Sequence, residues 1–281
     1  YFFNGTLPKR GSGDSAYWRG VVDGSTSATL WNSIHPYEDL PKVIDPPTGF
    51  VQNTNDAPWT STYPIQLRPA DFPAYTHGGR PEMWRTTSSL RMLTESPRLS
   101  FDDLNDRKHS SRLEFAERVV DELLAAIASN QKPLVREAST VLKSWDRQAD
   151  AASRGALLFE LIAPKLQFAT TLDPLKPFDT PKGLRQSGDA LAEIVEAAAT
   201  QALKLYGALD ARWGDWRRIV RGNQDLPANG GPGALGAFRV FNFAPAGAAK
   251  LTASMGDTFY CLVEFANPVR ARALTVYGNS S

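Results

Sequence analysis

Apolar side chains recur at intervals of three and four between about residues 85 and 207, the spacing that gives a helix one apolar face. The clearest stripe consists of Phe115, Val119, Val120, Leu123, Leu124 and Ile127. Similar stripes predict a helix that starts near Arg85 and further helices over residues 138–145, 157–162 and 187–206. The middle of the chain is therefore predicted to be helical.

The stretches on either side of this helical region follow other patterns. Residues 1–84 are rich in Pro, Gly, Trp and Tyr, which predicts short strands joined by long ordered loops. Strands are also predicted over residues 238–243, 258–265 and 272–277, with turns at Gly247 and Pro268. The three stretches 1–84, 85–207 and 208–281 together predict an α+β fold.

Composition narrows the class of protein. With 281 residues, 42% of them hydrophobic, the chain can bury a sizeable core. Its 31 basic and 30 acidic residues leave a net charge of +1, so no charge block indicates nucleic acid or an anionic membrane as a partner. No apolar run approaches the roughly 20 residues that cross a bilayer. The lone Cys261 cannot form an internal disulfide, and its apolar neighbours predict that it is buried.

Residues 46–59 form the most informative segment. The apolar pair Phe50-Val51 is followed by four hydrogen-bonding side chains, Gln52 to Asn55, and then by a turn that Pro58 and Trp59 close. Neutral amide donors gathered at a strand end suit a developing oxyanion. The alternative is a polar loop whose Asn and Asp side chains cap their own backbone.

Other short segments occur in a characteristic order around this one. They are Phe3-Asn4-Gly5, Pro8-Lys9-Arg10, Trp18-Arg19-Gly20, Trp31 and His35-Pro36 before it, and Trp213-Gly214-Asp215, the run from Gly230 to Gly236, Phe238-Arg239-Val240, Gly256-Asp257-Thr258, Val263-Glu264-Phe265 and Tyr277-Gly278-Asn279-Ser280 after it. In this order the chain resembles the penicillin and cephalosporin acylase family, and most closely its cephalosporin and acyl-homoserine-lactone branch. The resemblance covers nearly the whole chain.

The resemblance implies a four-layer αββα N-terminal-nucleophile hydrolase fold, of which this chain supplies a part with a helical excursion. In the family the nucleophile is a serine that opens the larger subunit, and its own α-amino group, which titrates near pH ~8 in simple peptides, is the base. This chain begins with Tyr1, which cannot take that role. We therefore expect the C-terminal portion of a larger subunit, inactive alone. Its expected partners are the smaller subunit and the serine-bearing part of the larger one.

The resemblance assigns roles to four residues. Asn55 is implied to donate its side-chain amide to the oxyanion, and Asn53, two residues away on the same face of an extended chain, is the second candidate. Asp257 is implied to orient a histidine in the missing segment, the alternative being a turn aspartate. Arg85 is implied to lie near the active site, the alternative being an ordinary ion-pair residue.

No metal or cofactor is expected. His35, His77 and His109 lie far apart without metal-ligand spacing, and Asp102, Asp103 and Asp106 lack the spacing of a calcium loop and fit a helix start instead. Pro232 removes a backbone donor from the glycine-rich run, and no Lys-Ser/Thr pair follows it, which argues against phosphate binding.

The implied activity is hydrolysis of the amide bond between an acyl side chain and an amine nucleus, by way of an acyl-enzyme. Acyl-homoserine lactones, penicillins and cephalosporins are the implied small-molecule substrates, and the periplasm is the implied location. A non-catalytic scaffold derived from an acylase is one alternative. An unrelated amidase or glycosidase with paired acids is another.

Overall fold

The computed structural model describes residues 6–11, 15–76, 84–169, 173, 175–179, 183–246 and 250–275. Predictions that concern Tyr1 to Gly5, His77, Gly247 and Tyr277 to Ser280 lie outside these residues. The chain divides into two compact units, one of Tyr1–Glu95 with Leu172–Asp179 and one of Ser96–Thr171 with Thr180–Ser281. The second unit thus joins the predicted helical stretch to the returning strands.

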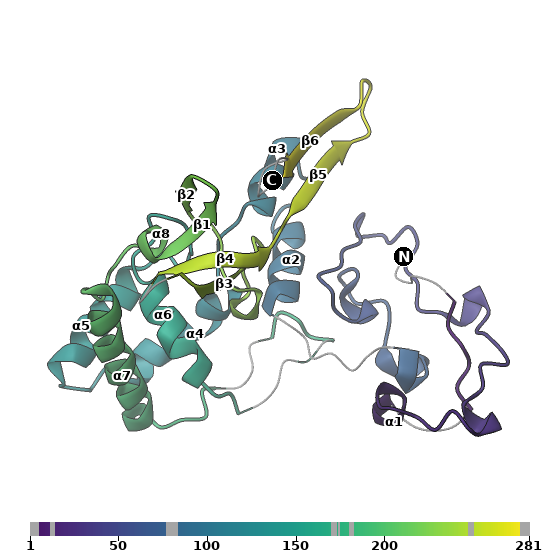
Figure 1. The fold of residues 1–281 in the computed structure, drawn as a ribbon, viewed down its shortest axis with the longest axis horizontal. Helices are drawn as coiled ribbons and strands as arrows, with labels where there is room; N and C mark the ends of the chain where they lie inside the picture. Colours follow the sequence, from purple (N-terminus) through teal and green to yellow (C-terminus); the bar gives the residue numbers. More distant parts are fainter. Residues whose placement is uncertain are drawn as a thin grey trace. The chain divides into compact units, whose positions relative to one another are not determined.

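The first unit is built from short helical turns and loops (Figure 1). Its elements are α1 (Ser15–Arg19), η1 (Ser27–Thr29), η2 (Tyr37–Asp39), η3 (Pro58–Thr60), η4 (Pro69–Asp71), η5 (Ala74–Thr76) and α2 (Trp84–Thr94). Proline opens both η3 and η4, where its fixed φ suits the first helical position. The helix predicted to start near Arg85 is confirmed as α2.

The short strands predicted for residues 1–84 are wrong within the described part of that stretch. Residues 6–11 and 15–76 hold only an isolated bridge between Pro8 and Ile34. Proline is frequent here and cannot donate to a strand ladder, so the backbone folds into turns. Trp59 stabilises these turns by burial, and its ring stacks on Phe72 with centroids 5.8 Å apart.

The second unit contains the predicted helices. Its helical elements are α3 (Phe101–Lys108), α4 (Glu114–Ala126), α5 (Pro133–Ser144), α6 (Ala156–Ile162), η6 (Ala163–Lys165), α7 (Gly188–Tyr206), α8 (Trp213–Trp216) and η7 (Gly233–Leu235). The apolar stripes of α4 to α7 meet in a common core, where Val119, Leu123, Leu158 and Val195 are fully buried. No helix in the described ranges is long and apolar enough to span a bilayer.

A four-stranded sheet in the order β2-β1-β4-β3 completes this unit. Its strands are β1 (Arg217–Arg221), β2 (Gln224–Pro227), β3 (Phe241–Pro245) and β4 (Leu251–Gly256). β1 pairs with β4 in parallel, and the pairs β1–β2 and β3–β4 are antiparallel. The strand predicted over residues 238–243 therefore begins later, at Phe241, and the sequence analysis missed β1, β2 and β4.

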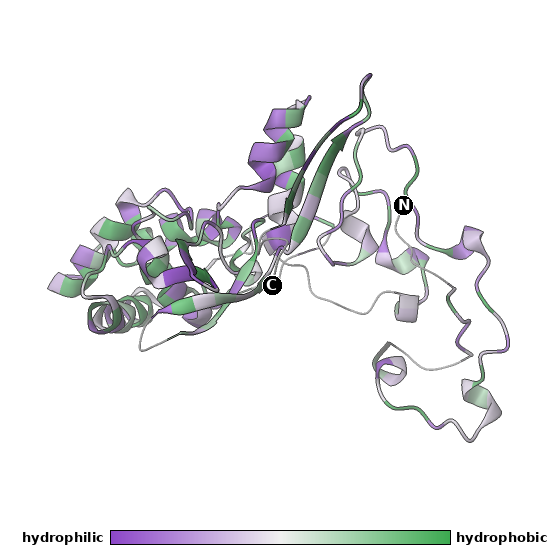
Figure 2. Cartoon of the chain, turned by 45° about the horizontal axis from the view of Figure 1, so that its top comes forward, coloured by the Kyte–Doolittle hydropathy of each residue, from purple (hydrophilic) through white to green (hydrophobic). Residues whose placement is uncertain are grey.

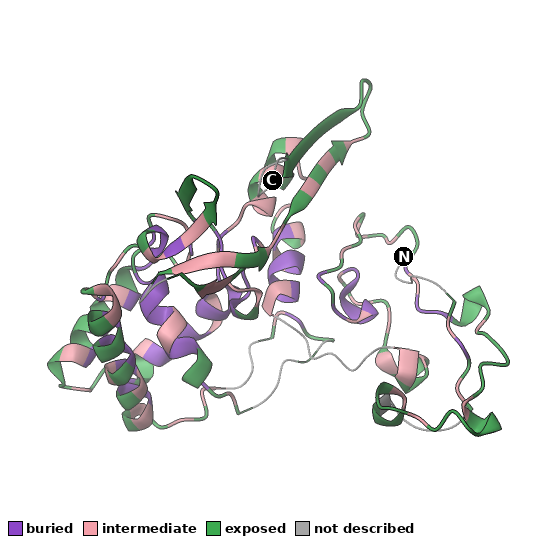
Figure 3. Ribbon diagram, in the orientation of Figure 1, coloured by how far each residue is buried: buried purple, intermediate pink, exposed green. Residues whose placement is uncertain are grey.

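The last two strands, β5 (Phe259–Glu264) and β6 (Arg270–Thr275), form a separate antiparallel hairpin. One of its faces lies against α3, where Arg270 covers the Phe101 ring and Arg272 contacts Asp102. A hydrogen bond from Arg270 holds the pKa of Glu264 below its ordinary value. Figure 3 shows β6 exposed along its whole length.

The predicted burial of Cys261 is wrong, because this cysteine is exposed on the hairpin. Side chains alternate between the two faces of a strand, so Cys261 shares its face with Phe259 and Val263. Those two side chains are 62% and 43% exposed. Hydrophobic residues therefore run along an uncovered face of the hairpin within the described residues (Figure 2).

Gly155, at the start of α6, has a left-handed φ of 127°, and an added Cβ would lie 2.6 Å from Cγ of Trp145. We predict that Gly155→Ala lowers the free energy of unfolding by about 2–5 kcal/mol, the sum of backbone strain and overpacking. Gly207→Ala is the matched control. Gly207 also has a positive φ, 75°, but a Cβ added there would have no neighbouring atom within 4 Å. It should cost only about 1 kcal/mol. Equal losses in urea unfolding would contradict the packing argument.

Candidate functional site

The polar segment of the sequence is a closed loop. The Gln52 amide N–H donates to the Ser61 carbonyl at 2.7 Å, and the Thr62 hydroxyl donates to the Phe50 carbonyl at 2.9 Å. The Gln52 side chain adds a bond to the Thr60 carbonyl at 2.6 Å. These bonds join the two ends of the loop, so residues 53–59 project from a fixed base.

Asn55 lies within this loop with a φ of 70°, in the left-handed region. Asparagine tolerates this region better than most residues because its short polar side chain bonds locally. Here the backbone N–H of Asn55 donates to Oδ1 of Asn53 at 2.9 Å. Asn53, the second predicted oxyanion donor, therefore caps the loop, as the alternative interpretation of this segment expected.

Arg85, in the first turn of α2, meets Asn55 across 30 residues of sequence. Its Nη2 donates to Oδ1 of Asn55 at 2.7 Å and also to the Thr54 carbonyl. A guanidinium has donors only, so this contact identifies the oxygen end of the Asn55 amide. Nδ2 is therefore the opposite, donating end. The structure thus brings together three of the four predicted site residues, Asn53, Asn55 and Arg85.

Asp56 is a residue that the sequence analysis did not single out. It is 6% exposed, and its carboxylate accepts from the Thr54 backbone N–H at 2.9 Å and from the Thr60 hydroxyl. Next to Ala57-Pro58 it resembles an ordinary turn aspartate in sequence. Only the folded loop distinguishes it, because its partners lie on both sides of Asn55.

Asp257 belongs to the second unit and lies just after β4. Its Oδ2 is 2.6 Å from Nζ of Lys108 and 3.9 Å from Nη1 of Arg239. Beside this pair, Nε2 of His109 contacts the Tyr260 hydroxyl, and Nδ1 of His109 lies 2.8 Å from the Asn105 carbonyl. The Asp257 side chain is thus an ion-pair partner of two cations, which neither sequence interpretation expected.

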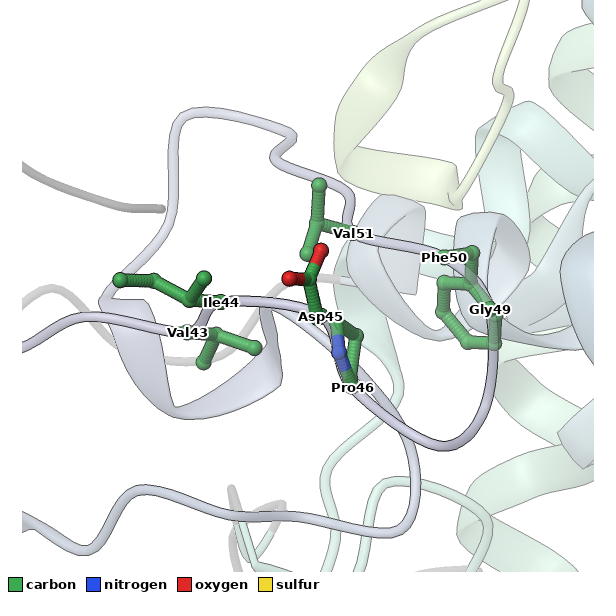
Figure 4. A pocket seen from close by; sticks show the side chains of 7 residues that line it. All are labelled: Val43, Ile44, Asp45, Pro46, Gly49, Phe50 and Val51. Carbon is green, nitrogen blue, oxygen red and sulfur yellow. The ribbon is translucent and has the colours of Figure 1, made fainter.

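An open pocket of about 550 Å³ lies just upstream of the Asn55 loop. Its lining comes from the two sides of the turn at residues 47–48 (Figure 4): Val43, Ile44, Asp45, Pro46, Gly49, Phe50 and Val51. Most of these side chains are apolar, so the pocket suits an apolar group. A second pocket, of about 520 Å³, lies in the second unit and is lined largely by charged side chains, among them Arg154, Arg212 and Lys250.

The part of the chain that the structure describes contains no cluster of side chains that could hold a metal ion. There, no three His, Cys, Asp or Glu side chains converge. His35 instead contacts the Tyr75 hydroxyl at 2.9 Å through Nε2. The groups around Asn55 are thus neutral amides and hydroxyls with one guanidinium and one carboxylate, a set suited to binding developing negative charge rather than a cation.

Three known proteins that are similar to this chain in sequence are named as acylases. The chain is similar to acyl-homoserine lactone acylase PvdQ of Pseudomonas fluorescens (strain Pf0-1), with 29% identity over 266 residues, which are 87% of this chain and 34% of that protein. It is similar to aculeacin-A acylase of Actinoplanes utahensis, with 28% identity over 78% of this chain and 31% of that protein. Penicillin G acylase of Escherichia coli is 32% identical over 52% of this chain and 16% of that protein.

The chain spans about a third of the length of the first two of these relatives. Its sequence also matches the family model described as penicillin amidase, over residues 1–281. The chain therefore belongs to the penicillin amidase family.

Proposed function

We propose that this chain carries the oxyanion-stabilising amide of an acylase. The complete enzyme would hydrolyse the amide bond between an acyl side chain and an amine nucleus, as in acyl-homoserine lactones, penicillins and cephalosporins. The contact between Arg85 and Oδ1 of Asn55 carries this proposal, because it fixes which end of the amide donates. Membership of the penicillin amidase family argues against the unrelated amidase or glycosidase with paired acids that the sequence left open.

The proposed reaction needs a nucleophile from another segment. A serine hydroxyl attacks the amide carbonyl, and its proton passes to the serine's own α-amino group. The carbonyl oxygen then carries negative charge, which Nδ2 of Asn55 stabilises by a hydrogen bond. Collapse of this intermediate breaks the C–N bond, the amine leaves with a proton, and water releases the acid from the acyl-enzyme. A neutral donor favours the transition state without binding the ground state equally tightly.

Arg85 supports this role in two ways. Its bond to Oδ1 of Asn55 orients the amide, and its positive charge polarises that amide so that the Nδ2–H becomes a better donor. A non-catalytic scaffold has no need of an amide held in this way. We thus propose that Arg85 is a positioning residue of the active site, while Asn55 is the donor that it positions.

We also propose that the chain packs against the rest of its enzyme, namely a smaller subunit and the serine-bearing part of the larger one. The uncovered face of the β5–β6 hairpin supports this, with Phe259 62% exposed and Val263 43% exposed. Neighbouring apolar side chains exposed together commonly mark an interface. Strands added to this hairpin by the rest of the enzyme would complete the four-layer αββα fold. We propose the periplasm as the location of the enzyme.

Asn55→Ala in the complete enzyme is predicted to lower kcat by about 10²–10³, the usual cost of losing one oxyanion donor. The measurement is release of free amine from acyl-homoserine lactone and penicillin substrates. Asn55→Asp should lose a similar factor, because it keeps the local shape but replaces the donor with an acceptor. The control is Gln66→Ala, which removes an exposed amide of the same unit. Normal turnover in Asn55→Ala would refute the proposal.

Asp257 is proposed to orient a histidine near the nucleophile, and its pairing with Lys108 provides the test. An orienting role predicts that Asp257→Asn lowers kcat by as much as about 10⁴, as for a triad carboxylate. Lys108→Met breaks the same ion pair from the other side and should leave kcat near normal. If both variants lose stability alike and keep turnover, Asp257 is an ion-pair residue only.

A further inference from the structure

The Asp56 carboxylate is buried and receives hydrogen bonds on both oxygens. Oδ1 accepts from the Thr54 backbone N–H at 2.9 Å, the Thr54 hydroxyl at 3.2 Å and Nδ2 of Asn53 at 3.3 Å. Oδ2 accepts from the Thr60 hydroxyl. Burying a carboxylate is costly unless donors surround it, and here the donors come from residues before and after it in the loop.

One branch of this network leads to the Asn55 backbone. The amide of Asn53 donates through Nδ2 to Asp56, which leaves Oδ1 of Asn53 as the acceptor for the Asn55 N–H at 2.9 Å. Asp56 therefore sets the orientation of the Asn53 amide, and that amide holds Asn55 in its left-handed conformation. The Asp56 backbone carbonyl, 3.4 Å from the same Nδ2, favours the same orientation, so Asp56 holds the Asn53 amide through both its side chain and its backbone.

The second branch leads to α2. Because the Thr54 hydroxyl donates its single proton to Asp56, it must accept in its 2.8 Å contact with the Thr86 hydroxyl. Thr86 immediately follows Arg85, whose guanidinium binds Oδ1 of Asn55. The carboxylate thus fixes both the loop that bears Asn55 and the helical turn that bears Arg85.

We propose that Asp56 is a positioning residue that holds the Asn55 amide in its donating geometry through Asn53 and Thr54. The proposal rests on the function proposed above. Asp56 is buried within the loop and acts only through its neighbours. A shift of about 1 Å in a catalytic group can cost about 10²-fold in rate, so loss of this network should act on kcat rather than on KM.

The test is a double-mutant cycle in the complete enzyme, with Asp56→Ala, Asn55→Ala and the double variant. Asp56→Ala should lower kcat by about 10–10²-fold with KM within about twofold. In the Asn55→Ala background the same change should lower kcat less than about twofold, since the group it positions is already gone. A structural defect alone would lower kcat by the same factor in both backgrounds.

Conservative rescue gives a second readout. Asp56→Asn keeps an oxygen acceptor for Thr54 and Asn53, and the Thr60 hydroxyl can accept from its new amide, so kcat should recover to within about fivefold of the native value. Asp71→Ala and Asp71→Asn are the matched controls, since Asp71 is an exposed acid of the same unit. Both should leave kcat unchanged.

If Asp56→Ala does not fold, Thr60→Val replaces it in the cycle, because it removes the donor to Oδ2 with little change of shape. Full kcat in folded Asp56→Ala or Thr60→Val, or equal losses in both Asn55 backgrounds, would overturn the positioning role. Failure of the proposed function has a different signature, in which Asn55→Ala itself keeps normal turnover.

Discussion

The bond between Arg85 and Oδ1 of Asn55 is the constraint on which the candidate site depends. The two ends of a primary amide have nearly the same shape, so an amide without a selective neighbour can present either its oxygen or its nitrogen. A charge-assisted bond of this kind contributes about 1.5–3 kcal/mol, enough to favour one orientation strongly. The arginine therefore determines the chemistry that Asn55 offers without itself supplying the donor.

The first unit holds the Asn55 amide in this orientation with few regular secondary-structure elements. Its loop is held by side chains that bond backbone groups, such as Gln52 to Thr60 and Thr62 to Phe50, and by the burial of Trp59. Prolines restrict the unfolded backbone and so reduce the entropy lost on folding. Functional residues often lie on loops for this reason, since a loop held by many local bonds can adopt backbone conformations that helices and strands exclude.

Sequence periodicity predicted α4 to α7 because the spacing of apolar residues directly reflects which face of a helix is buried. It missed β1 and β4, whose pairing joins segments that are distant in sequence, and it placed Cys261 in a core although its strand has one uncovered face. The family resemblance selected Asn55 and Arg85, but their contact spans 30 residues and was visible only after folding. Asp56 gave no signal, because a buried loop carboxylate and a solvated turn aspartate look alike in sequence.

The β5–β6 hairpin, near the other end of the sequence from Asn55, also has a surface suited to contact with further polypeptide. A two-stranded hairpin is marginally stable by itself, and among the described residues α3 supports one face of it through contacts such as Arg270 over Phe101. The other face presents Phe259, Cys261 and Val263 to solvent at a cost that burial against further polypeptide would remove. The role proposed for the Asn55 amide has a parallel requirement, since an oxyanion donor has a function only beside a nucleophile. Both features are therefore explained by the same proposal, that this chain works as one part of a larger acylase.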